Sequence, residues 1–192
     1  MRTLIATIAA TCLLSLSGAA HAQQRHASHG FFKNGITFGL DTGVSIPLGN
    51  YADANSVGGG AMVTAEYHLL DMVGATMRVG FEAHMNRTIG LTDTHVHAIP
   101  VLLGTKYYLG GSKTGMFGAF ELGIFDLIQS SSTGGNRPTS TSSNDLKFGM
   151  GAGLGYQQDR WNVRLNVHTQ DIGSFSDAIV ITTGIGYQFA AL

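Results

Sequence analysis

One short stretch of the chain places an acidic and two imidazole side chains at every second position. Asp93, His95 and His97 lie two residues apart, and His84 lies upstream of them. Imidazole and carboxylate groups are zinc ligands, and a structural zinc site takes four of them. Residues two apart share one face of a strand, so the three side chains would lie side by side. Nothing else in the sequence completes a tetrahedral set, so we expect no metal site and interpret these residues as polar groups near an interface.

A nucleophilic site is the second chemistry to consider. A catalytic serine needs a base and an orienting group within hydrogen-bond reach. Ser174 and Ser176 could meet His168 only if their loop folded back. The glycine runs at residues 58–60 and 149–155 lack the strand-turn-helix context and the Lys-Ser/Thr pair of a phosphate loop. We therefore expect no catalytic residue and no cofactor.

The composition of the 192-residue chain excludes several classes of protein. Charged residues make up 12%, about half the usual ~25%, and apolar residues make up 44%, too many for a chain kept disordered by charge. Only 3 prolines accompany 27 glycines, which excludes collagen. A net charge of −1 provides no basic field for nucleic acid, so none is expected as a partner. The length favours a single domain.

Residues 1–22 have the features of a secretory signal peptide. A positively charged start precedes an apolar run over residues 4–16, and Ala20-His21-Ala22 is an A-x-A cleavage pattern. The run is shorter than the ~20 residues of a membrane-spanning helix. We expect export and cleavage after Ala22. Cleavage also removes Cys12, the only cysteine, so the mature chain would have no disulfide.

Residues 23–34 are largely polar, and we expect a flexible lead-in to one domain over residues 35–192. Within that domain no window has a convincing helical period, whereas many alternate between apolar and polar residues, as strands do. Each alternating segment is at least as long as the ~9–11 residues of a tilted membrane-spanning strand. The eight segments are residues 35–46, 57–70, 72–84, 95–109, 114–128, 145–157, 160–170 and 178–189.

The connections between these segments alternate in length. Short turns at one rim and long loops at the other are typical of outer-membrane barrels, whose long loops are external. We therefore expect the N- and C-termini at the periplasmic rim. The stretch 129–144 is rich in Ser and Thr and is interpreted as a mobile surface loop, a common place for binding sites. An extracellular ligand would bind through the long loops, residues 47–56, 86–94, 129–144 and 171–177.

The residue types on the two faces of each segment indicate which face lines the barrel interior and which face lies outside. In the seventh segment, one face carries Trp161 and Leu165, and the other carries Arg164 and Asn166. Eight strands leave an interior just wide enough for side chains to fill, which suits the small polar face. The bulky apolar face must then point outward, which is stable only in lipid. The predicted fold is therefore all-β, an eight-stranded antiparallel up-and-down transmembrane β-barrel, whose closure satisfies the backbone within the bilayer.

By their parity, the inward-facing positions of the segments include four acidic and four basic residues. Because buried charges are tolerable only when paired, we predict a charge network across the lumen. Pro100, within the fourth segment, cannot donate to the ladder, so a bulge or a locally missing bond is expected there. The predicted network consists of Asp41, Glu66, Arg78, Glu82, Lys106, Glu121, Lys147 and Arg164.

Three stretches carry a resemblance to a known family. Residues 44–51 end the first segment and residues 99–108 lie in the fourth, and both are similar to stretches that recur in that family at those places. The last segment has a polar residue, a glycine and two aromatic residues at Thr182, Gly184, Tyr187 and Phe189. With the signal peptide and the eight segments, the chain resembles the small OmpA/OmpX-like outer-membrane β-barrel proteins of Gram-negative bacteria.

The resemblance implies a function and partners. It implies that the four residues of the last segment form the signal read by the outer-membrane barrel assembly machinery, although Phe189 is followed here by three more residues. It also implies a place in the cell outer membrane, in contact with its lipid and lipopolysaccharide. We expect a structural or surface-interaction protein, acting in adhesion or envelope integrity, without catalytic activity.

Two other functions stay open from the sequence. The first is a lipid A-modifying outer-membrane enzyme. Lipid A deacylases of this size carry a serine two residues after a histidine, and His168-Thr169-Gln170 departs from that pattern. The second is a secreted soluble ligand-binding barrel, which would turn its large apolar face inward.

Overall fold

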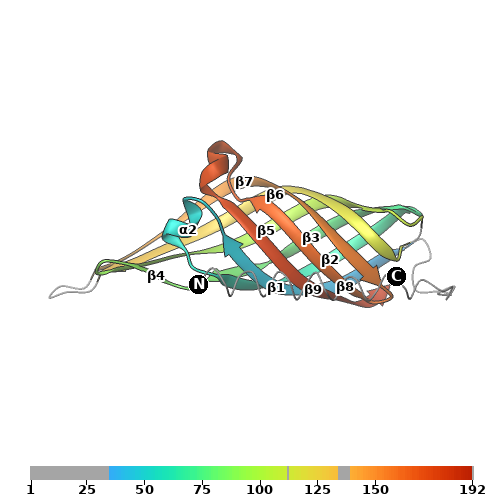
Figure 1. The fold of residues 1–192 in the computed structure, drawn as a ribbon, viewed down its shortest axis with the longest axis horizontal. Helices are drawn as coiled ribbons and strands as arrows, with labels where there is room; N and C mark the ends of the chain where they lie inside the picture. Colours follow the sequence, from blue (N-terminus) through green and yellow to red (C-terminus); the bar gives the residue numbers. More distant parts are fainter. Residues whose placement is uncertain (1–34, 112, 134–138, 192) are drawn as a thin grey trace, which may run out of the picture. The chain divides into compact units, whose positions relative to one another are not determined.

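The computed structural model describes residues 35–111, 113–133 and 139–191, and these form a closed β-barrel (Figure 1). Each strand of the wall is antiparallel to both of its neighbours, and pairing between β3 and β5 closes the ring. The predicted eight-stranded up-and-down barrel is confirmed. The wall consists of β1 (Ile36–Pro47), β2 (Gly58–Leu70), β3 (Val73–His84), β5 (Thr92–Tyr108), β6 (Gly115–Thr133), β7 (Thr139–Gln158), β8 (Trp161–Thr169) and β9 (Ile179–Ala191).

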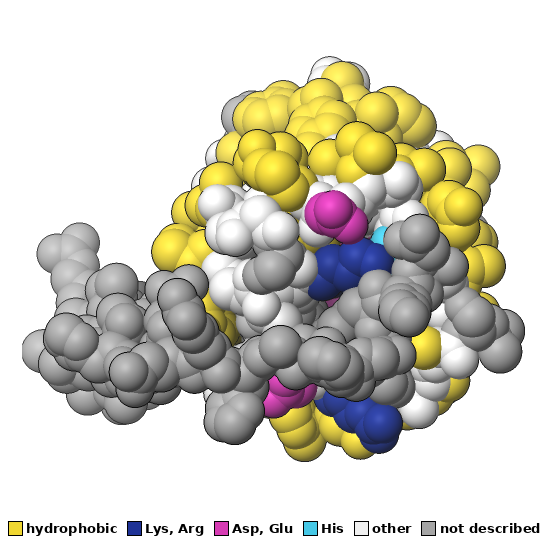
Figure 2. Space-filling model, turned by 90° about the vertical axis from the view of Figure 1, so that its right-hand side faces the viewer, with side chains coloured by type: hydrophobic (Ala, Val, Ile, Leu, Met, Phe, Trp, Pro, Cys, Tyr) yellow, Lys and Arg dark blue, Asp and Glu magenta, His cyan; other side chains and the backbone are white. Residues whose placement is uncertain are grey.

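The side chains alternate between the outside of the wall and the lumen. In β8, Trp161 and Leu165 are 58% and 52% exposed, whereas Asn162 and Asn166 are each 6% exposed. Viewed along the barrel, hydrophobic side chains cover most of the visible outer surface, and acidic and basic side chains are visible near the middle (Figure 2). An exposed apolar wall around a polar interior is stable in a bilayer and unstable in water. The alternative of a soluble barrel is therefore wrong.

The two rims of the barrel differ in structure. At the rim where β1 begins and β9 ends, which we call the turn rim, strands are joined by short connections such as Asp71–Met72 and Asp159–Arg160. The opposite loop rim carries two short helices, α2 (Tyr51–Ala54) and η1 (Ile172–Asp177). Across the described ranges, no helix has the length and apolar character needed to cross a membrane. The predicted signal peptide and lead-in lie outside the described residues.

The strands at the loop rim are longer than the sequence predicts. The predicted loop 129–144 is a continuation of β6 to Thr133 and of β7 from Thr139, with paired register throughout. The predicted loop 86–94 holds a further short strand, β4 (Arg87–Ile89), which pairs with the start of β5. Gly90, at a φ of 65°, supplies the positive φ that this tight hairpin needs. Both stretches resemble loops in sequence because polar residues, chiefly Ser and Thr, dominate them, but Thr is β-branched and pairs well in strands.

Pro100 interrupts the wall locally, as predicted. The pairing of β3 with β5 continues from Val73 to Val79 and resumes at Glu82 opposite Ala98, without a change of register. The two positions between lack a pair, and Pro100 occupies one of them. On its other side, Pro100 stays in register with Phe125 of β6. The proline has no N–H to donate where a ladder bond would form, and the wall accommodates it without a bulge.

Candidate functional site

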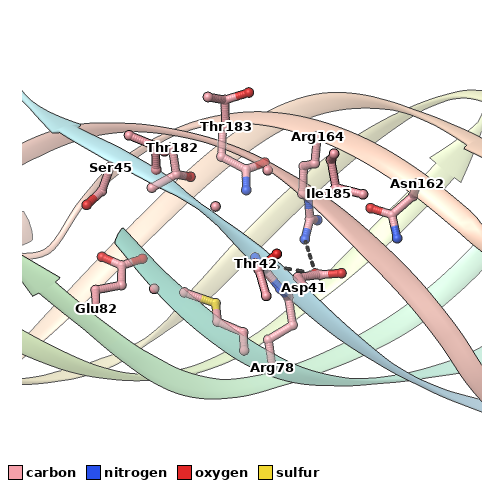
Figure 3. Close-up of a pocket in the computed structure, with 16 residues that line it drawn as sticks. Asp41, Thr42, Ser45, Arg78, Glu82, Asn162, Arg164, Thr182, Thr183 and Ile185 are labelled. Atoms are coloured by element: carbon pink, nitrogen blue, oxygen red, sulfur yellow. Dashed lines mark ion pairs between the residues drawn. The ribbon is translucent and has the colours of Figure 1, made fainter. Parts of the chain in front are cut away.

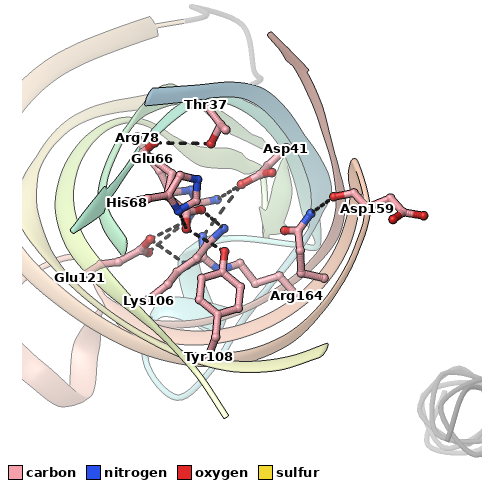
Figure 4. Close-up of polar contacts among 11 residues, drawn as sticks. Thr37, Asp41, Glu66, His68, Arg78, Lys106, Tyr108, Glu121, Asp159 and Arg164 are labelled. Carbon is pink, nitrogen blue, oxygen red and sulfur yellow. Dashed lines mark hydrogen bonds and ion pairs between the residues drawn. The ribbon is translucent and has the colours of Figure 1, made fainter. Parts of the chain in front are cut away.

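Four charged side chains form a layer across the middle of the lumen (Figure 4). Arg78 lies 3.2 Å from Asp41 and 3.0 Å from Glu121. Arg164 lies 3.0 Å from Glu121 and 3.9 Å from Asp41. Two guanidinium groups and two carboxylates therefore alternate around a ring, so each charge faces two of opposite sign. We call this set the central layer.

The residues of the central layer are spaced regularly around the barrel. Its residues come from β1, β3, β6 and β8, which are every second strand around the ring. The strands between them contribute mainly glycine at the paired positions. Gly186 is paired with Asp41, and a Cβ there would overlap the Asp41 carboxylate. The register places Gly104 and Gly151 opposite Glu121, and Gly155 and Gly184 opposite Arg164.

A second cluster lies towards the turn rim. Lys106 donates to the Glu66 carboxylate at 2.8 Å, and the Tyr108 hydroxyl donates to the same carboxylate at 2.7 Å. The His68 ring nitrogen lies 3.6 Å from Glu66. The Lys106 ammonium also lies 4.9 Å from the centre of the Phe117 ring, a cation–π distance. Tyr108 and His68 were missed from the sequence, although their inward parity, two residues from Lys106 and Glu66, would have found them.

Glu82 lies nearer the loop rim, and its nearest partners are an amide and an imidazole. Its carboxylate lies 3.5 Å from the Gln170 amide nitrogen and 3.8 Å from the His168 ring nitrogen. His168 in turn stacks on Phe125 at a ring-centre distance of 5.6 Å. All four side chains are directed into the lumen, so His168 serves the packing there.

Lys147 does not join the luminal network, contrary to the prediction. Its ammonium lies 3.0 Å from Asp145 and 3.3 Å from Asp171, at the loop rim. The prediction was wrong because Lys147 lies where β7 leaves the barrel body, so inward parity there leads to the open loop rim and leaves the side chain 34% exposed. Lys147 instead ties the segment before η1 to the side of β7.

A small cavity lies between the central layer and Glu82 (Figure 3). Its volume is about 50 Å³, and Ser45, Asp41, Arg164 and Thr182 are among its lining residues. Charged, hydroxyl-bearing and apolar groups line it together, and its volume has room for a few water molecules. Drug-sized ligands need pockets of ~300 Å³ or more, so this space suits hydration of the charged groups and excludes a larger ligand.

The segment around α2 closes the outer mouth of the lumen. Tyr51 is 7% exposed and packs on Val96 and Val180. Asn55 fixes the segment, because its side-chain oxygen accepts from the Val96 N–H at 2.7 Å. The hydroxyl of Thr94 donates to the Ala54 carbonyl at 3.0 Å. Burial raises the pKa of the Tyr51 phenol above its ordinary value, so it stays neutral beneath this cover.

The histidines considered for metal binding are engaged otherwise. Nδ1 of His97 accepts the His84 backbone N–H at 3.3 Å, which leaves the proton of the neutral ring on Nε2 and that nitrogen unable to ligate. Asp93 accepts a bond of 2.6 Å from Thr88. His95 lies beside His97, with ring centres 4.5 Å apart. Among the described residues, no group of three or more His, Cys, Asp or Glu could hold a metal ion.

The structure also shows a serine–histidine pair that sequence reasoning missed. The Ser45 hydroxyl lies 3.1 Å from Nε2 of His84, and Nδ1 of His84 lies 2.9 Å from the Val96 carbonyl. The carbonyl fixes the tautomer, so Nε2 accepts from Ser45. Ser45 and His84 are only 2% and 3% exposed, with the Tyr51 ring against His84. We interpret the pair as a fastening between β1 and β3. Ser174, considered from the sequence, lies exposed in η1.

Beyond the loop rim, four strands continue as a sheet that we call the outer extension. It comprises β4 and the adjoining ends of β5, β6 and β7, at residues 92–97, 128–133 and 139–144. In Figure 1 the described ends of β6 and β7 lie beside the β4–β5 hairpin, at the end of the structure away from the barrel body. The ends of β6 and β7 are rich in hydroxyl groups, since residues 130–133 and 139–143 are all Ser or Thr. Thr92 of β5 contacts Thr133 of β6 across the strands at 3.1 Å. Along β7, every residue from Thr139 to Leu146 is exposed, on both faces of the sheet.

Comparison with known proteins decides the family. The family described as outer membrane protein beta-barrel domain matches residues 8–189. The chain belongs to this family. No curated protein sequence matches it.

Solved structures share the fold of this outer-membrane barrel at low sequence identity. The attachment invasion locus protein Ail of Yersinia pestis has a TM-score of 0.58 and 15% identity, over 82% of this chain and 100% of that one. Ail in complex with the heparin analogue sucrose octasulfate has a TM-score of 0.56 and 13% identity, with the same coverage. A major outer membrane protein of Thermus thermophilus has a TM-score of 0.50 and 15% identity, over 80% of this chain and 99% of that one. At these identities, the similarities concern the fold alone.

The protein is an outer-membrane protein, and its last strand carries the predicted assembly residues. β9 pairs with β8 and β1 and so completes the wall of the barrel. Tyr187 packs against Trp161 with ring centres 4.7 Å apart, and Phe189 is 53% exposed. These aromatic residues lie near the turn rim, where an aromatic girdle meets the membrane interface. Thr182 and Gly184 lie on the luminal side of the same strand.

Proposed function

We propose that this outer-membrane barrel is a surface-interaction protein that also supports envelope integrity, without catalytic activity. The carrying observation is the outer extension. A paired sheet holds its shape beyond the membrane, so it presents a fixed surface and loses little conformational entropy on binding. The central layer and the cluster at Glu66 support the structural part of the role, because they tie alternate strands together inside the lumen.

The partners proposed from the sequence fall into two groups. The lipid-facing wall contacts outer-membrane lipid and lipopolysaccharide, and the last strand contacts the barrel assembly machinery during insertion. Extracellular ligands bind at the loop rim, through the outer extension together with the segments 47–56 and 171–177. Support for this division comes from exposure, since Thr139–Leu146 are open to solvent and the walls below are apolar.

The charge of the loop rim favours a neutral or cationic partner. Five aspartates, against Arg87 and Lys147, give the described side chains of this end a net charge of −3. The heparin analogue bound in the Ail complex is strongly anionic, and like charges reduce association. We therefore propose that sulfated saccharides are not ligands of this chain. The aspartates are Asp53, Asp93, Asp126, Asp145 and Asp171.

Shortening the outer extension tests the proposal. Ser130 and Ser142 are paired, so an Asn-Gly turn can replace residues 131–141 and leave a standard hairpin. The shortened barrel should still insert and show heat-modifiable gel mobility. Cells that carry it should lose adherence to surfaces coated with extracellular-matrix protein, relative to cells that carry the intact protein. Equal adherence of both strains would exclude the outer extension as the interaction element.

The enzyme alternative has a separate test. Lipopolysaccharide from a strain without the gene should have the same acyl pattern by mass spectrometry as that from the parent. The structure supports this expectation, because His168 is directed into the lumen against Phe125 rather than towards lipid. An altered acyl pattern would contradict the non-catalytic assignment.

A further inference from the structure

One edge of the outer extension has no partner strand. β7 pairs with β6 along its whole length, but its pairing with β8 begins only at Met150. The side of β7 from Lys147 onward is covered by the segment near η1, through the ion pair of Lys147 with Asp171. Within the described residues, the backbone edge at Thr139–Leu146 is therefore open. An open edge presents a row of unused N–H and C=O groups to any chain that can pair with it.

Residues 139–144 of this edge lack the usual protections against pairing, and the next residue, Asp145, is the first charge along it. Natural sheets guard their edges with charge, proline, bulges or very short strands. Residues 139–144 read Thr-Ser-Thr-Ser-Ser-Asn, without charge, proline or glycine. The opposite edge of the outer extension is guarded, since β4 has only three residues and Arg87 is one of them. Of the two edges of the outer extension, the β7 edge is therefore the one to which another strand can add.

The sequence of the edge is complementary to itself. Two copies of β7 can pair antiparallel about a twofold axis perpendicular to the sheet, so residues of equal parity oppose one another. With the axis at Thr141, Thr141 faces its own copy, Ser140 faces Ser142 and Thr139 faces Ser143. Every opposing pair is then hydroxyl with hydroxyl, an arrangement that stabilises cross-strand contacts. Asp145 falls outside this run, so no like charges are opposed.

Antiparallel pairing also decides where the second copy lies. β7 returns from the tip of the outer extension towards the membrane, so an antiparallel partner strand runs the opposite way. The second barrel must then sit inverted, at the far end of the joined sheet. We propose that the β7 edge joins two copies of this protein in facing membranes, as a continuous eight-stranded sheet across the gap. This inference rests on the proposed function and names a second copy of the chain as the partner.

The charge of the loop rim sets the salt dependence of this contact. Each end carries a net charge of −3 among its described side chains, so the approach of two copies is opposed by repulsion. Salt screens charges beyond about 8 Å at physiological ionic strength. The pairing itself is uncharged, so added salt should strengthen association. A contact made of ion pairs would respond in the opposite way.

Separate nanodisc populations, with donor and acceptor dyes on their scaffold proteins, test the contact. Each disc holds one barrel and leaves both rims accessible, so energy transfer reports association between discs. Wild-type discs should show transfer that rises with salt. Thr141→Lys discs should lose it, and Thr141→Asp discs should lose it, whereas a mixture of the two should regain it, because opposite charges then face each other.

The matched control is Ser131→Lys. Ser131 is paired with Thr141 on β6, on the same face but one strand inside the edge. That variant should associate like wild type. Transfer that persists in Thr141→Lys discs, or a mixture that stays separate, would overturn the proposed pairing. If wild-type discs stay apart while adherence of cells still requires the outer extension, this inference fails and the proposed function stands. If adherence is also unaffected by the shortening, both fail.

Discussion

The barrel wall and the outer extension share three strands, β5, β6 and β7, yet only the part of these strands in the wall shows its structure in the sequence. Inside the membrane, a strand has lipid on one face and a packed polar interior on the other, so its residues must alternate. Beyond the loop rim, both faces of β7 meet water, and the alternation disappears. Periodicity therefore reports a difference between two solvents, and a strand with the same solvent on both sides resembles a loop.

The two regions also differ in how their polar groups are held. Arg164 is 7% exposed and is balanced by two carboxylates, so its interactions are strong and specific. The hydroxyls of the outer extension compete with water for every bond. We expect the lumen to dominate stability and the outer extension to contribute little to it.

Removal of one charge from the central layer should have the largest effect. Arg164→Met leaves Glu121 and Asp41 with one guanidinium instead of two in a buried site. Loss of one partner of a buried ion pair typically lowers stability by about 3–5 kcal/mol. Urea unfolding in lipid vesicles measures this difference. A loss as small as that of a surface variant would show that water, rather than the ion pairs, satisfies these charges.

A charge placed on the lipid face should have the next largest effect. Leu165→Arg introduces a guanidinium on the outer wall, where the cost near the bilayer midplane is about 2–4 kcal/mol. Asn166→Ser, one residue away and directed inward, is the matched control and should be mild. Equal losses in the same unfolding titration would contradict the assignment of the two faces.

Filling the space beside Phe117 should have a moderate effect. Gly155 is paired with Phe117, and a Cβ there would overlap the ring. Overpacking of this kind costs about 1–3 kcal/mol. Gly155→Ala should therefore unfold at lower urea, and Phe117→Leu in addition should recover part of the loss. Gly118→Ala, where a Cβ meets nothing within 4 Å, is the control and should unfold near the wild-type midpoint.

A change within the outer extension should have the smallest effect. Ser142→Ala removes one exposed hydroxyl from β7, and surface substitutions usually change stability by less than about 0.5 kcal/mol. Unfolding titrations should not distinguish this variant from wild type. A loss comparable to that of Gly155→Ala would mean that the outer extension supports the barrel below it.

Much of the wall could be predicted because the bilayer enforces one pattern on it. The eight segments, their faces and the missing pair at Pro100 all followed from parity and from the chemistry of proline. The central layer was within reach for the same reason. The placement of the central layer on every second strand could not be predicted. It depends on the stagger between neighbouring strands, which a single sequence does not show.

The errors share a cause at the loop rim. The length of β6 and β7, the strand β4 and the placement of Lys147 all lie where the bilayer no longer constrains the chain. Lys147 has the parity of an inward-facing residue, but at the loop rim an inward-facing side chain is no longer buried. A signal was available in residues 128–133 and 139–144, which could pair residue by residue around a short turn, with β-branched Thr on both sides.

The gap in pairing beside Pro100 gives the wall a preferred place to loosen. Gly80 and Phe81 of β3 have no backbone pair on β5, and the Phe81 ring lies beside His97 with ring centres 5.6 Å apart. Amide protons along this seam should exchange with solvent sooner than those of the continuous β6–β7 ladder, since local opening begins where the fewest backbone bonds must break. Local opening of the barrel wall would then begin at the contact between β3 and β5 rather than be shared evenly among all strand pairs.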